Sequence, residues 1–223
     1  MRLPRAAVPT GPGLLSELPF AAFLQYSPHG KNEISKESRG WRDAVKQDAP
    51  GQIARAVQAL AVRLESAGLK AFLGPEIALA PTPRSVPLRS RDALWPARRV
   101  CEELVEQGLG SEILEIVVRK EAVRKSAYAP RGERPEPEDH LRSLSVAEKP
   151  LLPHPKITVV DDFVTRGATL LAVASLVHDA FPESEVRAFA LLRTMGLVPE
   201  IDTIVAPCSG WIRYVGGKLL REP

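Results

Sequence analysis

The sequence predicts an α/β protein with a doubly wound, mainly parallel sheet. Two observations lead to this prediction: short runs rich in Val, Ile and Leu stop at turn residues, and stretches with apolar residues at helical spacing lie between them. No internal repeat is visible. In such sheets ligands bind beyond the carboxyl ends of the strands. The residues at which the strands end are therefore the first candidates for chemistry.

The 223 residues are enough for one domain with a sizeable core. Aromatic residues make up only 5% of the chain, so the core must consist mainly of Leu, Val, Ile and Ala. The net charge of +3 suits a small polyanionic ligand, and it permits nucleic-acid contact without indicating it. Two isolated cysteines, Cys101 and Cys208, cannot form a four-cysteine zinc site. We expect Cys101 to pack in the core.

The first half of the chain begins with an irregular segment. Residues 1–50 are rich in Pro and Gly without a sustained period, although 14–26 suit a short helix or strand. From residue 53 to 68, apolar residues recur at helical spacing and a glycine ends the run. A strand is expected over 76–80, and it must stop at Pro81 because proline cannot continue an internal ladder.

The second half alternates helix and strand. A helix is expected from Asp92 or Leu94 to Gln107, followed by a strand over 113–118. Residues 119–155 are rich in Arg, Glu and Pro without a period, and so long a loop is usually functional or mobile. Further strands are expected over 156–161, 186–192 and 203–206, with a helix over 169–181. We thus expect a core over 51–207 and a C-terminal tail, 208–223, that packs on the core or on an N-terminal hood formed by residues 1–50.

Neither a signal peptide nor a membrane span is expected. The first residues include prolines and no continuous apolar stretch, and no other segment approaches the length needed to cross a bilayer. We therefore expect a cytoplasmic protein.

Residues 157–171 are the most informative part of the chain. An apolar run ends in two adjacent carboxylates, Asp161 and Asp162, and a helix is expected to begin a few residues later. The loop between them contains Thr165, Arg166, Gly167, Ala168 and Thr169. Carboxylates accept hydrogen bonds from vicinal hydroxyls, and the free N–H groups of a helix start favour an anion. This combination predicts a site for a sugar phosphate.

These residues resemble the motif with which type I phosphoribosyltransferases bind 5-phosphoribosyl 1-pyrophosphate (PRPP). That motif has apolar residues, two acids, two apolar residues, Thr, Thr or Ser, Gly, Gly or Ala, and Thr. The chain departs from it at Arg166, where the family usually has a small hydroxyl residue. Paired acids also follow strands in phosphoacceptor and phosphatase domains, and a plain strand–turn–helix is the simplest alternative. Neither needs Thr-x-Gly-Ala-Thr directly behind the acids.

The resemblance implies a doubly wound fold of the type I phosphoribosyltransferase kind, a pyrophosphate-binding turn and a flexible loop that closes over PRPP. The turn would lie after the strand that ends at residue 80, where donors come from Thr82, Arg84 and Ser85. A proline-stiffened turn without a ligand is the alternative. The segment 119–149 corresponds in position to the closing loop. Its candidates are Arg119, Lys120 and Arg142, and a solvated, charge-mixed linker is the alternative for each.

A wider stretch resembles the ComF-type competence branch of this family. Pro81-Thr82-Pro83 is followed by several arginines and then by Trp95-Pro96. In that branch a Pro-x-Pro strand end precedes an Arg-rich loop and an aromatic-Asn-Gln sequence that opens a helix. Here Trp95-Pro96 replaces the polar pair of that sequence, and the N-terminal four-cysteine zinc ribbon of the branch is absent from this chain.

The resemblance implies an enzyme of nucleotide metabolism. It would bind PRPP with Mg²⁺ and transfer phosphoribosyl to a nitrogen acceptor, a nucleobase-like compound, with release of pyrophosphate. Because Mg²⁺ prefers phosphate, hydroxyl and water oxygens, it would be held through PRPP rather than by a protein cage. The alternatives are a non-catalytic PRPP sensor, a ComF-like protein that acts with a DNA-uptake or helicase system, and a nucleic-acid module. Resembling enzymes are often homodimers.

Overall fold

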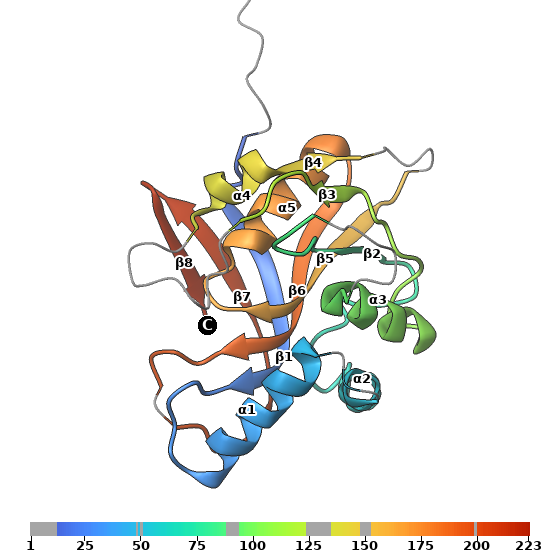
Figure 1. The fold of residues 1–223 in the computed structure, drawn as a ribbon. Helices are drawn as coiled ribbons and strands as arrows, with labels where there is room; N and C mark the ends of the chain where they lie inside the picture. Colours follow the sequence, from blue (N-terminus) through green and yellow to red (C-terminus); the bar gives the residue numbers. More distant parts are fainter. Residues whose placement is uncertain are drawn as a thin grey trace, which may run out of the picture.

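The structure is a computed structural model that describes residues 13–47, 49, 51–87, 94–123, 135–147, 153–198 and 200–223. Its main element is a six-stranded sheet with the order β2-β5-β6-β1-β7-β8 (Figure 1). The bounds of these strands are β1 Glu17–Tyr26, β2 Ala78–Pro81, β5 Lys156–Val164, β6 Glu185–Thr194, β7 Val205–Val215 and β8 Lys218–Glu222.

The first four strands of that order run parallel. β5 pairs with β2 on one side and with β6 on the other, and β6 pairs with β1. Their carboxyl ends, at Pro81, Val164, Thr194 and Tyr26, therefore lie along one edge of the sheet. In the same sheet β7 pairs antiparallel with β1, and β8 pairs antiparallel with β7. The predicted α/β class with a mainly parallel sheet is confirmed.

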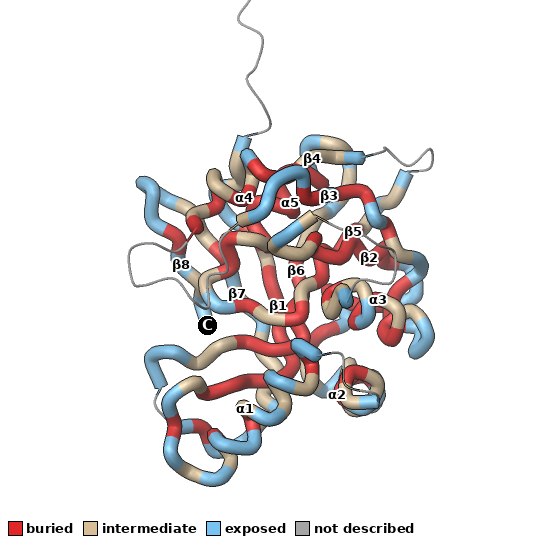
Figure 2. Tube along the Cα trace, in the orientation of Figure 1, coloured by how far each residue is buried: buried red, intermediate tan, exposed pale blue. Residues whose placement is uncertain are grey.

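Helices cover both faces of the sheet (Figure 1). α1 (Glu33–Lys46), α2 (Gln52–Arg63) and α3 (Pro96–Glu106) pack on one face, and α5 (Ala168–Ala180) packs on the other beside α4 (Pro137–Ser143). Alternating strand residues divide between two buried clusters: Val159 belongs to the α5 side and Val160 to the α1–α3 side. Figure 2 shows the resulting buried layers on either side of the central strands.

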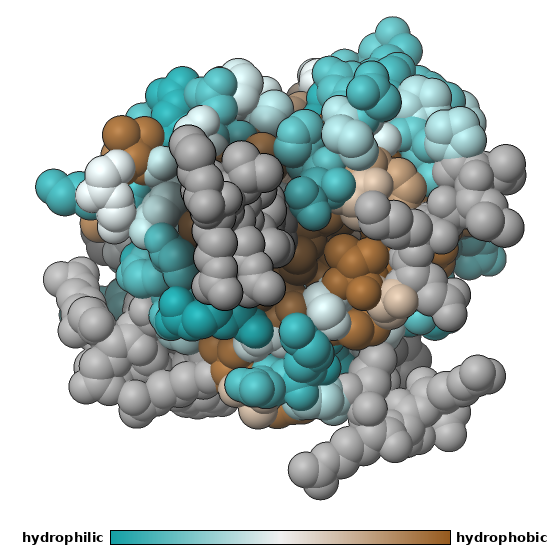
Figure 3. Space-filling view, turned by 90° about the horizontal axis from the view of Figure 1, so that it is seen from above, coloured by the Kyte–Doolittle hydropathy of each residue, from teal (hydrophilic) through white to brown (hydrophobic). Residues whose placement is uncertain are grey.

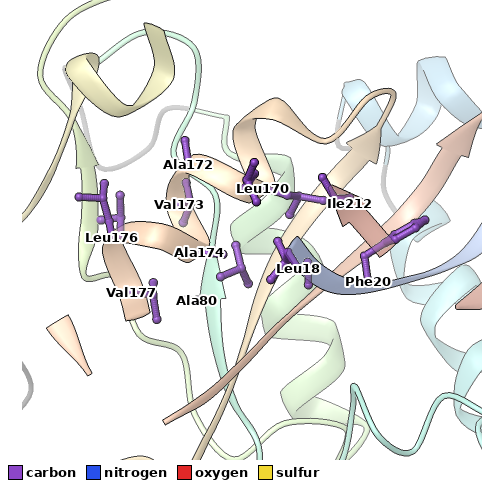
Figure 4. Close-up of a cluster of buried hydrophobic side chains, with 14 of the residues drawn as sticks. Leu18, Phe20, Ala80, Leu170, Ala172, Val173, Ala174, Leu176, Val177 and Ile212 are labelled. Carbon is purple, nitrogen blue, oxygen red and sulfur yellow. The ribbon is translucent and has the colours of Figure 1, made fainter. Parts of the chain in front are cut away.

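The α5 side explains why the predicted strand–turn–helix unit forms. α5 is apolar around its whole circumference, and its residues from Leu170 to Val177 are buried. They meet Phe20 of β1, Ala80 of β2 and Ile212 of β7 (Figure 4). Small Ala side chains on the helix allow close approach to the sheet. As expected, aliphatic residues and alanine dominate this core, and on the other face Cys101 is fully buried.

The N-terminal segment is more regular than predicted: the short helix or strand expected over 14–26 is the strand β1, and a helix follows it. β1 lies in the interior of the sheet, and the run from Phe20 to Leu24 is buried. The surrounding Pro and Gly residues suggested an irregular region. In addition, the apolar residues of β1 are continuous rather than alternating, as is usual in a strand that is covered on both faces. α1 follows, and the side chain of its N-cap Asn32 accepts a hydrogen bond from the Ser35 N–H at 2.9 Å.

The predicted C-terminal tail is part of the same sheet. β7 and β8 form a hairpin whose turn residues, Gly216 and Gly217, have φ angles of 58° and 73°. Two consecutive positive φ angles are what a two-residue hairpin turn needs, and glycine adopts them without strain. The strand expected over 113–118 is divided between an isolated bridge at Ile113 and β3 (Val117–Arg119).

The segment expected to be one long loop contains regular structure. β3 pairs with β4 (Leu144–Val146), and α4 lies directly before β4. Residues 124–134 and 148–152 of this segment lie outside the described residues.

Seen from above, mostly hydrophilic residues surround a central hollow in which hydrophobic residues are visible (Figure 3). Among the helices that the structure describes, none is long and apolar enough to cross a bilayer.

Candidate functional site

The two predicted carboxylates lie at the carboxyl end of β5, and the strand continues through them to Val164. Asp161 Oδ1 accepts two hydrogen bonds, from Thr82 Oγ1 at 2.8 Å and from the Asp162 N–H at 2.9 Å. Burial and the negative charge of Asp162 raise the pKa of Asp161 well above its usual value. The site therefore holds one carboxyl group whose ionisation is opposed by its surroundings.

The neighbouring carboxylate is paired with a residue that the sequence did not indicate. Lys46, in the last turn of α1, donates from Nζ to Asp162 Oδ2 at 2.7 Å. The ammonium also lies 4.7 Å from the ring centroid of Phe163. Burial disfavours the charged lysine, but the attraction of Asp162 exceeds this effect and raises the pKa of Lys46. The protein itself thus places a positive charge, the Lys46 ammonium, beside the carboxylate of Asp162.

The predicted phosphate loop leads into α5 through a glycine. Gly167 is the N-cap of α5 with a φ angle of 92°, and no side chain caps the helix. A Cβ atom at this position would lie 2.5 Å from Ile212 Cδ1. No side chain of the described residues therefore competes with an anion for the first N–H groups of α5. Thr165 is exposed, and its hydroxyl lies 3.1 Å from that of Thr194 at the end of β6.

Arg166, the departure from the family motif, is bound to another part of the protein. Its Nη1 donates to Glu136 Oε1 at 2.9 Å, and its Nη2 donates to the Pro135 carbonyl at 3.4 Å. Glu136 is the N-cap of α4. The side chain predicted to bind phosphate is therefore held away from the loop by an acid, and a phosphate would have to compete with Glu136 for it.

The candidate pyrophosphate turn is only partly available to a ligand. Thr82 uses its hydroxyl for Asp161 and its N–H for the Val160 carbonyl at 2.8 Å. Both donors of Thr82 are thus engaged by the protein in this structure, and its hydroxyl positions Asp161. The side chains of Arg84 and Ser85 are partly exposed and have no hydrogen bond to any other described residue.

Trp95 explains the second departure from the family pattern. It precedes α3 as its N-cap, and its indole Nε1 donates to the Thr82 carbonyl at 2.7 Å. Pro96 occupies the first helical position, where its missing N–H costs nothing. The indole thus holds the turn through the Thr82 carbonyl. The ComF-type sequence has polar residues at this place.

Trp95→Phe should lower the free energy of unfolding by about 1 kcal/mol, because an aromatic ring remains while a partly buried hydrogen bond is lost. Urea denaturation followed by circular dichroism measures this change. Trp41→Phe is the matched control, since Trp41 has no hydrogen bond to any other described residue. Equal losses in the two variants would show that the bond to Thr82 contributes nothing.

Of the three predicted loop cations, the structure brings one to the site. Arg119 is buried, and its Nε donates to the Arg84 carbonyl at 2.9 Å while its Nη1 donates to the Ser143 hydroxyl. Burial lowers the pKa of Arg119 to about 10, against the attraction of Asp161. Lys120 is exposed. Arg142 is also exposed, and it pairs with Asp139 beside a surface hollow of about 360 Å³.

His140 of α4, a weaker candidate in the segment predicted to close over PRPP, has an unusual environment. It is 5% exposed, and neither ring nitrogen has a hydrogen-bond partner among the described residues. Burial and the charge of Arg119 lower the pKa of His140 to about 4. In the unfolded chain the imidazole takes up a proton near pH 6.5, whereas in the folded protein it does so only near pH 4. The free energy of unfolding therefore falls as the pH falls from about 6.5 to 4.

His140→Leu should remove this acid sensitivity. Between pH 7 and 4.5 the free energy of unfolding of the wild type should fall by about 2 kcal/mol more than that of the variant. Urea denaturation at a series of pH values gives both curves. His178→Gln, on the exposed end of α5, should keep the pH dependence of the wild type. Parallel curves for the wild type and His140→Leu would contradict the prediction.

A scan against models of known protein families and a search of curated proteins found no match for this chain. In the part of the chain that the structure describes, no group of three or more His, Cys, Asp or Glu side chains could hold a metal ion.

Proposed function

We propose that the protein binds PRPP as its Mg²⁺ complex on a fold of the type I phosphoribosyltransferase kind. One arrangement supports this above all others: Asp161 and Asp162 lie near the carboxyl end of a central parallel strand, and the loop that follows this strand leads to the glycine-capped start of α5. The carboxylates suit the ribose hydroxyls, and the helix start suits the 5-phosphate. Mg²⁺ would be held by ligand and water oxygens beside the two carboxylates.

The same arrangement suits phosphoribosyl transfer to a nitrogen acceptor. As the bond from ribose C1 to pyrophosphate breaks, positive charge builds on the ring. Negative charge on the carboxyl groups of Asp161 and Asp162 would stabilise this positive charge. Arg84 and Ser85 adjoin the place of the leaving pyrophosphate, and Arg119 positions them through the Arg84 carbonyl. A nucleobase-like acceptor would approach C1 from the side away from the leaving group.

A PRPP sensor that does not catalyse transfer is the second candidate, and two contacts favour it. Lys46 is bound to Asp162, and Arg166 is bound to Glu136. Binding of PRPP would have to rearrange both ion pairs, which connect the loop to α1 and to α4. Such contacts suit a protein whose conformation reports ligand binding, including one that acts with a DNA-uptake or helicase system.

Calorimetry with PRPP and Mg²⁺ tests the proposal. The wild type should bind, the double variant Asp161→Asn/Asp162→Asn should not, and Asp202→Asn on an exposed loop should bind like the wild type. No binding to the wild type, or equal binding by the double variant, would refute it. Release of pyrophosphate in the presence of a panel of nucleobases then distinguishes an enzyme from a sensor.

A further inference from the structure

Two arginines that no motif indicates lie beside the phosphate loop, at the carboxyl ends of β5 and β6. Arg221 comes from β8, the last strand of the chain. Its Nη1 donates to the Val164 carbonyl at 3.1 Å, and its Nη2 donates to the Thr194 carbonyl at 2.8 Å. Val164 directly precedes the loop residue Thr165, so this guanidinium joins the base of the loop to the end of the neighbouring strand.

Arg193 of β6 lies next to it with weaker bonds. It is only 9% exposed, and its Nη2 makes two long contacts, to Gln25 Oε1 at 3.4 Å and to the Ala206 carbonyl at 3.3 Å. Its Nε is buried and has no hydrogen-bond partner. A guanidinium has five N–H donors, so both arginines retain donors that no described residue satisfies.

Neither arginine has a carboxylate partner among the described residues. The contrast on the same hairpin is Arg213, which pairs with Glu17 and Glu222. Burial and the nearby charge of Arg193 lower the pKa of Arg221. A buried cation without a counter-charge is costly, and backbone carbonyls compensate it only in part. Arg193 is such a buried cation and Arg221 is half-buried, so the pair favours a nearby anion.

We infer that Arg193 and Arg221 form an anion-binding position that takes a phosphoryl group on the β6 side of the loop. Guanidinium groups bind phosphate through charge-assisted, often bidentate hydrogen bonds. The hydroxyls of Thr165 and Thr194 adjoin the position and supply neutral donors. If the phosphoryl group belongs to PRPP, the inference rests on the proposed function; if it belongs to free phosphate, the inference is independent of it.

Titrations with inorganic phosphate and with PRPP plus Mg²⁺, at constant ionic strength, test the position. In Arg193→Gln and Arg221→Gln the affinity for at least one of these ligands should fall tenfold or more. The rise in melting temperature that the same ligand gives the wild type should disappear in both variants. Arg213→Gln is the matched control, because it removes an exposed arginine of the same hairpin, and it should bind like the wild type.

Which ligand responds identifies the source of the phosphoryl group. A loss for PRPP alone assigns the position to the sugar phosphate, and a loss for inorganic phosphate alone assigns it to a separate ligand. If the wild type binds phosphate but not PRPP, the proposed function fails while this inference stands. If folded variants bind both ligands like the wild type and only melt earlier, the arginines merely join the strands and the inference is overturned. It is also overturned if the wild type binds neither ligand.

A second measurement covers the case that the glutamine variants do not fold. The arginine Nε–H signals of the wild type, assigned with Arg193→Lys and Arg221→Lys, should shift in NMR spectra on addition of phosphate or PRPP. Signals of both residues that stay in place while the ligand binds would equally overturn the inference.

Discussion

Asp161→Asn should make the protein more stable at neutral pH while it abolishes binding of PRPP. In the wild type, burial and the charge of Asp162 oppose ionisation of this carboxyl group and raise its pKa. The asparagine Oδ1 can still accept the hydrogen bonds from the Thr82 hydroxyl and the Asp162 N–H. The substitution therefore removes a carboxyl group whose ionisation the fold opposes, and it keeps the contacts of that group. A gain of about 1 kcal/mol in the free energy of unfolding at pH 7 is expected, as is common where a functional site is strained.

The pH dependence distinguishes this effect from a general one. A carboxyl group whose pKa is raised in the folded state stabilises it most below the pKa of the unfolded chain, near 3.9, and this contribution is lost as the pH rises through the folded pKa. The stability difference between Asp161→Asn and the wild type should therefore grow from pH 4 to pH 7. Urea denaturation across this range measures it, with Asp202→Asn as the exposed control. A variant that is less stable than the wild type at pH 7 would show that Asp161 supports the fold.

The part of the site that the sequence predicted is local in the chain. The apolar run before Asp161, the two acids and the loop to Gly167 lie within a few residues of one another, and strand, turn and helix are encoded in that order. Spacing and residue type are enough to predict such a unit. The alternation of strands and helices along the chain predicts a parallel sheet. The loop after a strand of such a sheet lies at the edge where the carboxyl ends of the strands meet.

The rest of the site depends on contacts between distant segments. Lys46 reaches Asp162 across 116 positions of the chain, and Arg221 reaches Val164 across 57. No local pattern encodes such pairs, since they follow from how α1 and β8 pack. One signal was present and not used: Gly216-Gly217 between two short runs is typical of a hairpin, and it would have indicated that the tail belongs to the sheet.

Gly167→Ala is expected to damage both the fold and the phosphate loop. The residue has a φ angle of 92°, where a side chain costs about 1–2 kcal/mol in backbone strain. In addition, the new Cβ atom would lie 2.5 Å from Ile212 Cδ1, and Ile212 is fully buried. The loop or the isoleucine must therefore shift, and crowding in a packed core costs typically about 1–3 kcal/mol more. A total loss of about 3 kcal/mol in the free energy of unfolding is expected.

Gly108→Ala separates the two causes. Gly108 also has a positive φ angle, 69°, but a Cβ atom there would meet nothing within 4 Å. It should therefore show the backbone strain alone, about 1–2 kcal/mol. The double variant Gly167→Ala/Ile212→Val shortens the side chain that the new methyl group meets, and it should recover part of the difference if crowding is the cause. Equal losses for Gly167→Ala and Gly108→Ala would show that the contact with Ile212 is unimportant. Because the helix start that this glycine caps is the proposed phosphate site, the loss of stability should be accompanied by weaker binding of PRPP, whereas Gly108→Ala should leave that affinity unchanged.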